Sequence, residues 1–284
     1  MDPKPVLSSI NPHPRDPFIK FEESNHSYTV ELNGVKVLAP TSATKFAENY
    51  FTAFDAARVV NANYWKWKQD TNSTYYNCIH ASFDAGATDD EAKLAIIEGW
   101  ERKSNEASSL GTSIHEECEL VCNGTLTEIT STEISQLIDW MSNWQKDKKW
   151  QPFRTEWRLY YEHEGQLLVA GTPDLVLKSA ETGEFALVDF KISASLLGPS
   201  TSPFTRQARP PIECFEDSKY GRYCAQLNIL SYILNAKYGI DVGPRMFLLQ
   251  LHRGMDTWHC VQVPQQNDET DTLFSVETRR RLSL

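Results

Sequence analysis

Three apolar, strand-like runs follow one another between residues 153 and 192, and this order constrains the fold more than any other feature of the sequence. The runs are Phe153–Tyr161, Leu167–Leu177 and Phe185–Ile192, and their turns are centred on Glu164-Gly165 and Thr182-Gly183. Turns this short join antiparallel strands, because parallel strands need a long crossover connection. The region is therefore predicted to form an antiparallel meander.

Helical patterns are predicted on both sides of the meander. Apolar periodicity and a capping box at Thr88 and Glu91 define them. The predicted helices cover residues 42–69 with a break near Phe51, 89–104, 105–122, 132–149 and 220–238. Further strands are predicted near residues 244–252 and 257–263. This order predicts an α/β domain with a helical N-terminal portion.

Four parts are predicted along the chain. Residues 1–18 form a flexible Pro-rich lead-in, and 19–104 form an N-terminal hairpin and helical region packed on the core. Residues 105–264 form the core itself, and a polar tail covers 265–284. Within the core, residues 194–216 form a long loop with four prolines. Loops of this length without regular structure are usually functional or mobile.

Three charged residues interrupt the apolar strands. Asp174 follows Pro173, and Asp189 and Lys191 lie in the run Leu187–Ile192. A buried charge is costly unless it is paired or bound to a metal. Asp189 and Lys191 are two residues apart and share one face of their strand, and a hairpin brings Asp174 beside Asp189. Two adjacent carboxylates favour Mg²⁺ or Mn²⁺, and a neighbouring lysine can orient or deprotonate a water. The alternative interpretation is a buried Asp–Lys ion pair with one hairpin-turn Asp.

The pattern Pro173-Asp174 … Asp189-Phe190-Lys191 resembles the signature of the PD-(D/E)xK nucleases. Two flanking motifs are similar to those of the RecB-like and λ-exonuclease-like branch. One is Gly111-Thr112-Ser113-Ile114-His115 followed by Glu119, and the other is Tyr223-Cys224-Ala225-Gln226-Leu227. The resemblance covers roughly residues 100–252, and the similar proteins are stand-alone nucleases of large DNA viruses and phages. It implies a restriction-endonuclease-like core, with a mixed central sheet flanked by helices.

The resemblance also implies residue roles. Metal binding falls to Asp174, Asp189, the backbone carbonyl of Phe190 and His115, and Lys191 is catalytic. Glu119, one helical turn after His115, is a further ligand or a partner of the ligands. The alternative for His115 is a core histidine. Glu156 either extends the acidic site or pairs with Arg154 or Arg158.

DNA contacts are predicted from three regions. Gln226, Tyr223 and Arg222 belong to the helix after the lysine strand, where Leu230 replaces the tyrosine that the branch often has. Arg206 and Arg209 lie in the Pro-rich loop, and Lys148 and Lys149 follow the helix before the meander. Phosphate contacts from such local basic groups fit a DNA substrate.

The overall charge limits where DNA can lie. The chain carries 28 Lys and Arg against 38 Asp and Glu, a formal net charge of -10. Residues 84–133 hold twelve acidic residues and three basic ones, so the rest of the chain is nearly neutral. DNA is therefore expected to avoid the acidic segment, and the salt dependence of binding is expected to follow local patches.

The sequence also indicates the cellular compartment in which the protein is expected. It has six cysteines without a CxxC pair, no apolar run long enough to span a membrane, and no secretory pattern at the N-terminus. We therefore expect an intracellular protein of the cytoplasm or nucleus.

A metal-dependent DNA nuclease, namely an exonuclease of recombination, repair or replication, is the first functional hypothesis. A non-catalytic binding protein on the same fold and an RNA-directed nuclease are the alternatives. The expected partners are DNA and a divalent metal, with a recombination or replication protein or a second copy of the chain left open. Polarity and strand preference are not readable from the sequence.

Overall fold

The computed structural model describes residues 6–126, 128–202 and 204–283, except for the side chains of Gln145, Asp147 and Lys148. The chain divides into two compact units: a core unit of Met1–Thr52 with Ile114–Leu284, and a helical unit of Ala53–Ser113. These bounds differ from the predicted ones. The N-terminal strands belong with the core unit, and the helical unit is a separate segment inserted between its two parts.

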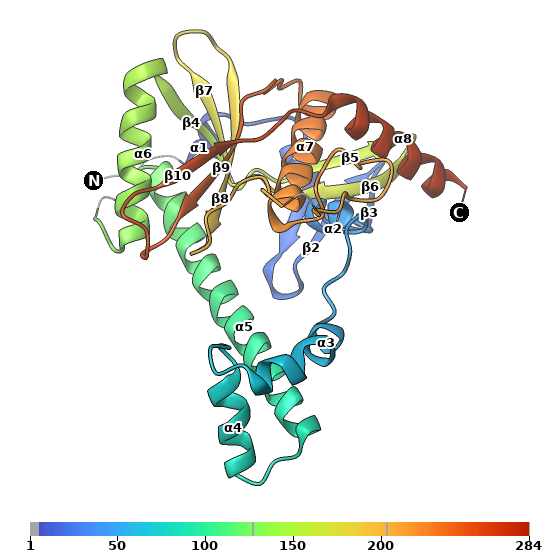
Figure 1. Ribbon diagram of the computed structural model, residues 1–284. Helices are drawn as coiled ribbons and strands as arrows, with labels where there is room; N and C mark the ends of the chain where they lie inside the picture. Colours follow the sequence, from blue (N-terminus) through green and yellow to red (C-terminus); the bar gives the residue numbers. More distant parts are fainter. Residues whose placement is uncertain (1–5, 127, 203, 284) are drawn as a thin grey trace. The chain divides into compact units, whose positions relative to one another are not determined.

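A mixed five-stranded sheet forms the centre of the core unit (Figure 1). Its strand order is β10-β9-β8-β7-β4, with β8 and β9 parallel and all other neighbours antiparallel. The strands are β4 (Trp150–Thr155), β7 (Leu175–Ser179), β8 (Phe185–Ile192), β9 (Met246–Leu251) and β10 (His259–Gln262). The predicted α/β class is confirmed. The predicted strands near 244–252 and 257–263 are confirmed as β9 and β10.

Helix α7 (Lys219–Tyr238) connects the two parallel strands, as a parallel pair requires. Its N-terminus is capped by Ser218, whose hydroxyl accepts a hydrogen bond from the Gly221 N–H at 3.0 Å, and its C-terminus ends at the left-handed Gly239. Helix α6 (Thr132–Lys148) lies on the other side of the sheet from α7 (Figure 1). The sheet is therefore covered on both faces, and the predictions of both helices are confirmed.

The predicted antiparallel pairing of the three runs is confirmed, but the prediction of three unbroken strands is wrong. The run 153–161 divides at Glu156 into β4 and β5 (Leu159–His163), and the run 167–177 divides at Pro173 into β6 (Gln166–Gly171) and β7. β4 then pairs with β7, while β5 and β6 form a sheet of their own. Glu156 has a left-handed backbone (φ 42°), and Pro173 has no N–H for a ladder. Both positions therefore end a strand.

The chain segment that leads from β6 to β7 passes close to two helices. Gly171 ends β6, and a Cβ atom at this position would lie 2.6 Å from Ala43 Cβ and 3.0 Å from Leu230 Cδ2. Ala43 begins α2 (Ala43–Glu48), and Leu230 lies in α7. Only glycine lets the chain pass between these helices, and Asp174 follows three residues later.

Three further predictions about local structure are wrong. The lead-in contains α1 (Leu7–Ile10) and a 3₁₀ turn over Asp16–Phe18, and Asp16 is tied to the core. The two helices predicted over 89–122 are one continuous helix, α5 (Asp89–Cys122). The predicted polar tail is instead helix α8 (Asn267–Leu282), which packs on the core through Leu273 and Phe274. The Phe274 ring stacks on the Tyr232 ring, with centroids 4.1 Å apart.

The predicted N-terminal hairpin is confirmed. β2 (Ser27–Leu32) and β3 (Val35–Leu38) flank Asn33-Gly34, and β1 (Ile19–Glu22) adds a third strand. The short helix α2 and the break after it are also as predicted. The Pro-rich stretch after β8 has no helix or strand of its own among its described residues, as predicted.

The helical unit has its own small core. It contains α3 (Ala56–Gln69), α4 (Tyr76–Asp84) and the first part of α5. Its core consists of Val60, Tyr64, Ile79, Ala92 and Ile96.

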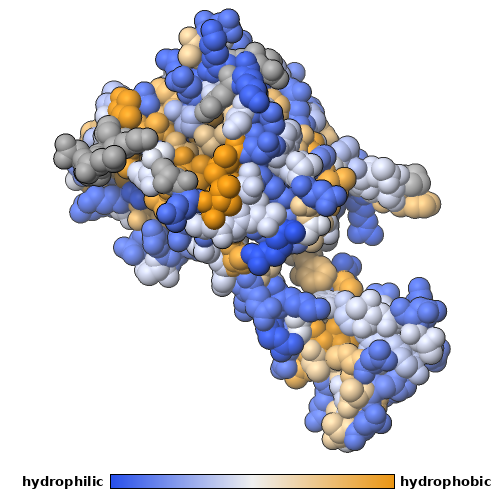
Figure 2. All heavy atoms as spheres, turned by 90° about the vertical axis from the view of Figure 1, so that its left-hand side faces the viewer, coloured by the Kyte–Doolittle hydropathy of each residue, from blue (hydrophilic) through white to orange (hydrophobic). Residues whose placement is uncertain are grey.

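Hydrophilic side chains cover most of the molecular face in Figure 2. Among the described residues, no helix combines the length and apolarity needed to cross a membrane.

Candidate metal centre

The hairpin of β7 and β8 brings the three predicted charged residues together. Leu175 pairs with Val188, so Asp174 and Asp189 lie next to each other at the open end of the hairpin. The Phe190 N–H donates a hydrogen bond to Asp174 Oδ2 at 2.5 Å. Lys191 Nζ lies 2.5 Å from Asp189 Oδ2 and 4.1 Å from the centroid of the Tyr223 ring. The predicted hairpin geometry of Asp174, Asp189 and Lys191 is thus present.

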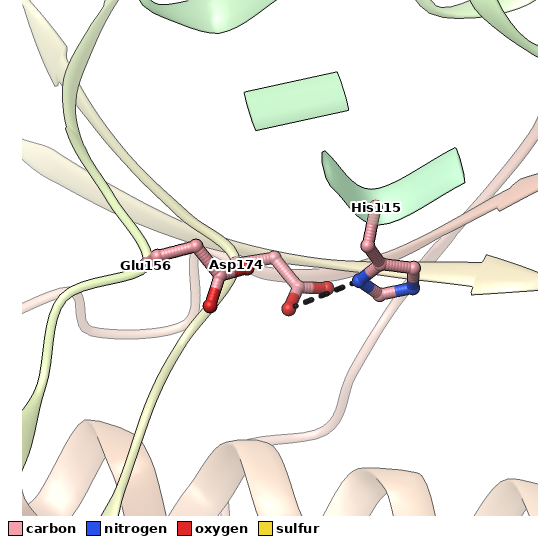
Figure 3. A group of neighbouring side chains, drawn as sticks. All are labelled: His115, Glu156 and Asp174. Atoms are coloured by element: carbon pink, nitrogen blue, oxygen red, sulfur yellow. Dashed lines mark ion pairs between the residues drawn. The ribbon is translucent and has the colours of Figure 1, made fainter. Parts of the chain in front are cut away.

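His115 reaches this hairpin from helix α5. Its Nδ1 lies 3.5 Å from Asp174 Oδ1, and its ring meets the Phe190 ring edge-on with centroids 6.0 Å apart. The side chain therefore points at a charged group of the hairpin (Figure 3). This contact argues against the alternative of an ordinary core histidine.

Glu156 completes a group of three possible metal ligands. One ligand atom from each of His115, Glu156 and Asp174 lies within 4.8 Å of the other two, in the part of the chain that the structure describes. Figure 3 shows the Glu156 and Asp174 carboxylates side by side, with His115 beyond Asp174. Glu156 lies at the corner between β4 and β5, and its N–H donates to the Asp174 carbonyl at 3.1 Å. Of the two alternatives for Glu156, the structure supports the acidic site. Arg154 pairs with Asp16 instead, and among the described residues Glu156 forms no ion pair with Arg158.

The charges of this group are strongly coupled. Burial and the charge of Asp174 raise the pKa of Glu156 to about 8. Burial would lower the pKa of His115, but Asp174 and Asp189 outweigh it and raise that pKa to about 9. Burial works against ionisation of Asp174 too, yet His115 and Lys191 hold its pKa below the usual value. Without a bound cation, protons on Glu156 and His115 therefore balance the clustered carboxylates at neutral pH.

Asp189 and Lys191 form a second, buried pair. Burial raises the pKa of Asp189 to about 6 in spite of the opposing charge of Lys191. Burial also opposes the charge on Lys191, but Asp189 and Asp174 raise the pKa of its ammonium group above the usual value. At neutral pH this pair is ionised on both sides, and Lys191 is a cation next to the ligand group.

The donor set fits a hard divalent cation. Two carboxylates and one imidazole supply oxygen and nitrogen ligands, which suit Mn²⁺ and, through the oxygens, Mg²⁺. Asp189 is not part of this group of three, and its Oδ2 contacts Lys191 Nζ. At Phe190 the contact to Asp174 comes from the backbone N–H, and its carbonyl stays a predicted ligand. The candidate ligand group therefore shares Asp174 and His115 with the predicted set, includes Glu156, and does not include Asp189.

Glu119 lies one helical turn beyond His115 and is outside the group of three. The Thr155 hydroxyl donates to Glu119 Oε1 at 3.5 Å, and Asn123 Nδ2 donates to the same hydroxyl at 2.9 Å. Burial raises the pKa of Glu119. Since Thr155 precedes Glu156, Glu119 contacts the residue next to a ligand, and its own role as a ligand stays a prediction.

Two of the predicted DNA contacts are engaged within the protein. Arg222 pairs with Asp217 at 3.1 Å and donates to the Thr52 carbonyl at 2.7 Å. Arg209 donates to the carbonyls of Asn49 and Phe51. Arg209 therefore attaches the Pro-rich loop to residues 49–51, and Arg222 connects α7 to Thr52 and Asp217. The contacts of both arginines to DNA stay predictions.

The other predicted DNA contacts lie in different environments. Arg206 and Lys149 are exposed, and Gln226 is half-buried on α7. Tyr223 lies under Lys191, so it is close to the centre. The side chain of Lys148 is outside the described residues.

Sequence reasoning missed Asp16, which contacts residues on both sides of Glu156. It lies more than 130 positions earlier in the chain, in a segment whose prolines indicate a loose lead-in. No local pattern connects the two. A lone Asp followed by Pro17 carries no signal of a distant partner.

Comparisons with known proteins add little. No family model matches the chain, and no curated protein matches it. Solved structures do match, among them one titled "Crystal structure of SSO0001", with 14% sequence identity and a TM-score of 0.26. The alignment covers 52% of this chain and 64% of that chain, so this chain spans less than two thirds of that protein's length.

Proposed function

We propose that this protein is a metal-dependent DNA nuclease with a PD-(D/E)xK core. One observation carries the proposal: Asp174 and the Asp189-x-Lys191 pair lie on adjacent antiparallel strands, and His115 contacts Asp174 from a neighbouring helix. A structural ion pair alone does not account for a third carboxylate and an imidazole at the same place.

Each residue has a role in the proposed reaction. Asp174, Glu156 and His115 would hold Mg²⁺ or Mn²⁺, with Asp189 next to them. The metal, when bound, supplies a polarised water and neutralises phosphate charge. Lys191, held as a cation by Asp189, stabilises the negative charge that develops on the phosphate. An ammonium group that stays protonated at neutral pH is better suited to this role than to accepting a proton from water.

A non-catalytic binding protein is the main alternative. A binder gains nothing from a partly buried cluster of three carboxylates, a histidine and a lysine, since removing each charge from water has a desolvation cost. The RNA-directed nuclease differs only in substrate, and the end-dependent exonuclease remains an expectation.

Titration of the folded protein with Mn²⁺ in a calorimeter tests the proposal without any substrate. We expect saturable binding that the Glu156→Gln variant weakens. Glu164→Gln serves as a matched control, because Glu164 is an exposed carboxylate in the β5–β6 turn. No binding of Mn²⁺ to the folded wild-type protein would favour the non-catalytic alternative.

The same titration should depend on pH. His115, with a pKa of about 9, and Glu156, with a pKa of about 8, must each lose a proton before they bind a metal. The Mn²⁺ affinity should therefore rise between pH 6 and pH 8, by up to about 10-fold per pH unit for each proton displaced. The slope should be shallower in Glu156→Gln. An affinity that is constant over this range would argue against these two ligands.

A further inference from the structure

The third ligand residue has an unusual backbone. Glu156 has a φ of 42°, in the left-handed region that residues with a side chain rarely adopt. Such a conformation persists only where the surroundings enforce it. One constraint is the hydrogen bond from its N–H to the Asp174 carbonyl. That bond fixes the backbone on one side only, so a second constraint is needed.

Asp16 provides contacts on both sides of this corner. Its Oδ2 accepts a hydrogen bond from Arg154 Nη1 at 2.8 Å, and its Oδ1 accepts one from Trp157 Nε1 at 2.8 Å. The Arg154 guanidinium also lies 4.4 Å from the centroid of the Trp157 ring. Arg154 is 5% exposed and Trp157 is 1% exposed, so neither side chain has an alternative partner in water. One carboxylate thus joins the residues at positions −2 and +1 relative to Glu156.

The N-terminal segment holds this carboxylate in place. The His13 N–H donates to Asp16 Oδ2 at 2.9 Å. Asn11 donates through Nδ2 to the Phe153 carbonyl at 2.9 Å, and its backbone carbonyl accepts a hydrogen bond from Arg154 Nη1 at 2.9 Å. The segment is therefore attached directly to β4, just before the corner.

We propose that Asp16 is a positioning residue of the metal centre. By joining Arg154 to Trp157, it keeps Glu156 in the left-handed conformation that places its carboxylate beside Asp174 and His115. This inference rests on the proposed metal-binding function. Its site lies outside the Asp174, Asp189 and Lys191 motif, in a segment far from that motif in the sequence.

The hydrogen-bond donors around Asp16 explain why a carboxylate is needed at this position. All three groups that meet Asp16 are N–H donors: those of His13, Arg154 and Trp157. Two carboxylate oxygens can accept all three, but an amide has only one acceptor oxygen and places an NH₂ group against a donor. Asp16→Asn therefore changes the contacts at one side of the corner while keeping the size of the side chain.

A double-mutant cycle on Mn²⁺ affinity tests the inference. We expect Asp16→Asn to weaken Mn²⁺ binding about 10- to 100-fold, as the loss of a partner that orients a ligand does. In the Glu156→Gln background, the same substitution should have no further effect, because Asp16 acts through Glu156. Trp157→Phe, which removes only one donor, should give a smaller loss and provides a second variant if Asp16→Asn folds poorly.

Glu162→Gln is the matched control. Glu162 binds Arg15 at 3.3 Å and Lys237 at 3.2 Å, so its loss also weakens the attachment of the N-terminal segment. It should lower the Tm but leave Mn²⁺ affinity unchanged. The inference is overturned if Asp16→Asn and Trp157→Phe bind Mn²⁺ like wild type, or if Asp16→Asn has its full effect in the Glu156→Gln background. A wild-type protein that binds no Mn²⁺ would instead overturn the proposed function itself.

Discussion

Lys191→Met should reduce Mg²⁺-dependent DNA cleavage by about 10²- to 10⁴-fold, the range that a single positioned catalytic group contributes. The substitution keeps an unbranched side chain but removes the ammonium group, which lies 2.5 Å from Asp189 Oδ2 and 4.1 Å from the centroid of the Tyr223 ring. Asp189 already has a pKa of about 6, raised by burial, and we expect it to bind a proton when its partner is lost. The expected result is therefore a folded protein with little activity.

Lys237→Met is the matched control for this experiment. Lys237 is also a partly buried lysine in an ion pair, with Glu162 at 3.2 Å, and its side chain is 20% exposed against 15% for Lys191. It should leave the cleavage rate unchanged. Thermal unfolding of both variants separates a loss of fold from a loss of chemistry. Full activity in a folded Lys191→Met variant would remove Lys191 from the mechanism.

Asp174→Asn should weaken Mn²⁺ binding more than the roughly 10- to 100-fold that loss of an outer partner costs, because Asp174 is itself a ligand in the proposed centre. The asparagine oxygen can still accept the Phe190 N–H, so the hairpin is retained. The pKa of His115 should fall from about 9, since Asp174 is the main group that raises it. Calorimetry measures the first effect, and NMR titration of the imidazole measures the second.

The two measurements test different claims about the site. A lower His115 pKa with unchanged Mn²⁺ affinity would place the metal elsewhere. An unchanged His115 pKa would contradict the contact between His115 and Asp174 itself. Glu184→Gln is a suitable control, because Glu184 is a surface carboxylate in an ion pair with Arg245, in the β7–β8 turn at the far end of the hairpin from Asp174.

Local patterns in the sequence were sufficient for most helices and for the β7–β8 hairpin. Ser131 and Ser218 cap α6 and α7, and the Thr182-Gly183 turn joins the two strands. The break between β4 and β5 was not predictable in the same way. It depends on a left-handed residue at Glu156, where neither glycine nor asparagine marks a turn. Helix α8 was missed because two buried apolar residues in a mostly polar segment give no periodic signal.

The candidate site was predictable where its residues share one hairpin. Asp174, Asp189 and Lys191 come from neighbouring strands, so spacing and strand periodicity were enough. Glu156 could be named only as one of two alternatives, because its position depends on the corner after β4. Asp16 could not be found, because its contacts to Arg154 and Trp157 exist only after the N-terminal segment has packed on β4.

Digestion of end-labelled linear duplex, single-stranded DNA and closed circular DNA by the wild-type protein tests the central claim most directly. We predict cleavage of linear DNA in Mg²⁺ or Mn²⁺, and its loss in EDTA and in the Asp174→Asn variant. Cleavage of the circle as well would indicate an endonuclease rather than the expected exonuclease. The account is contradicted if the protein cleaves none of these DNAs with either metal, or if cleavage persists unchanged in EDTA and in Asp174→Asn.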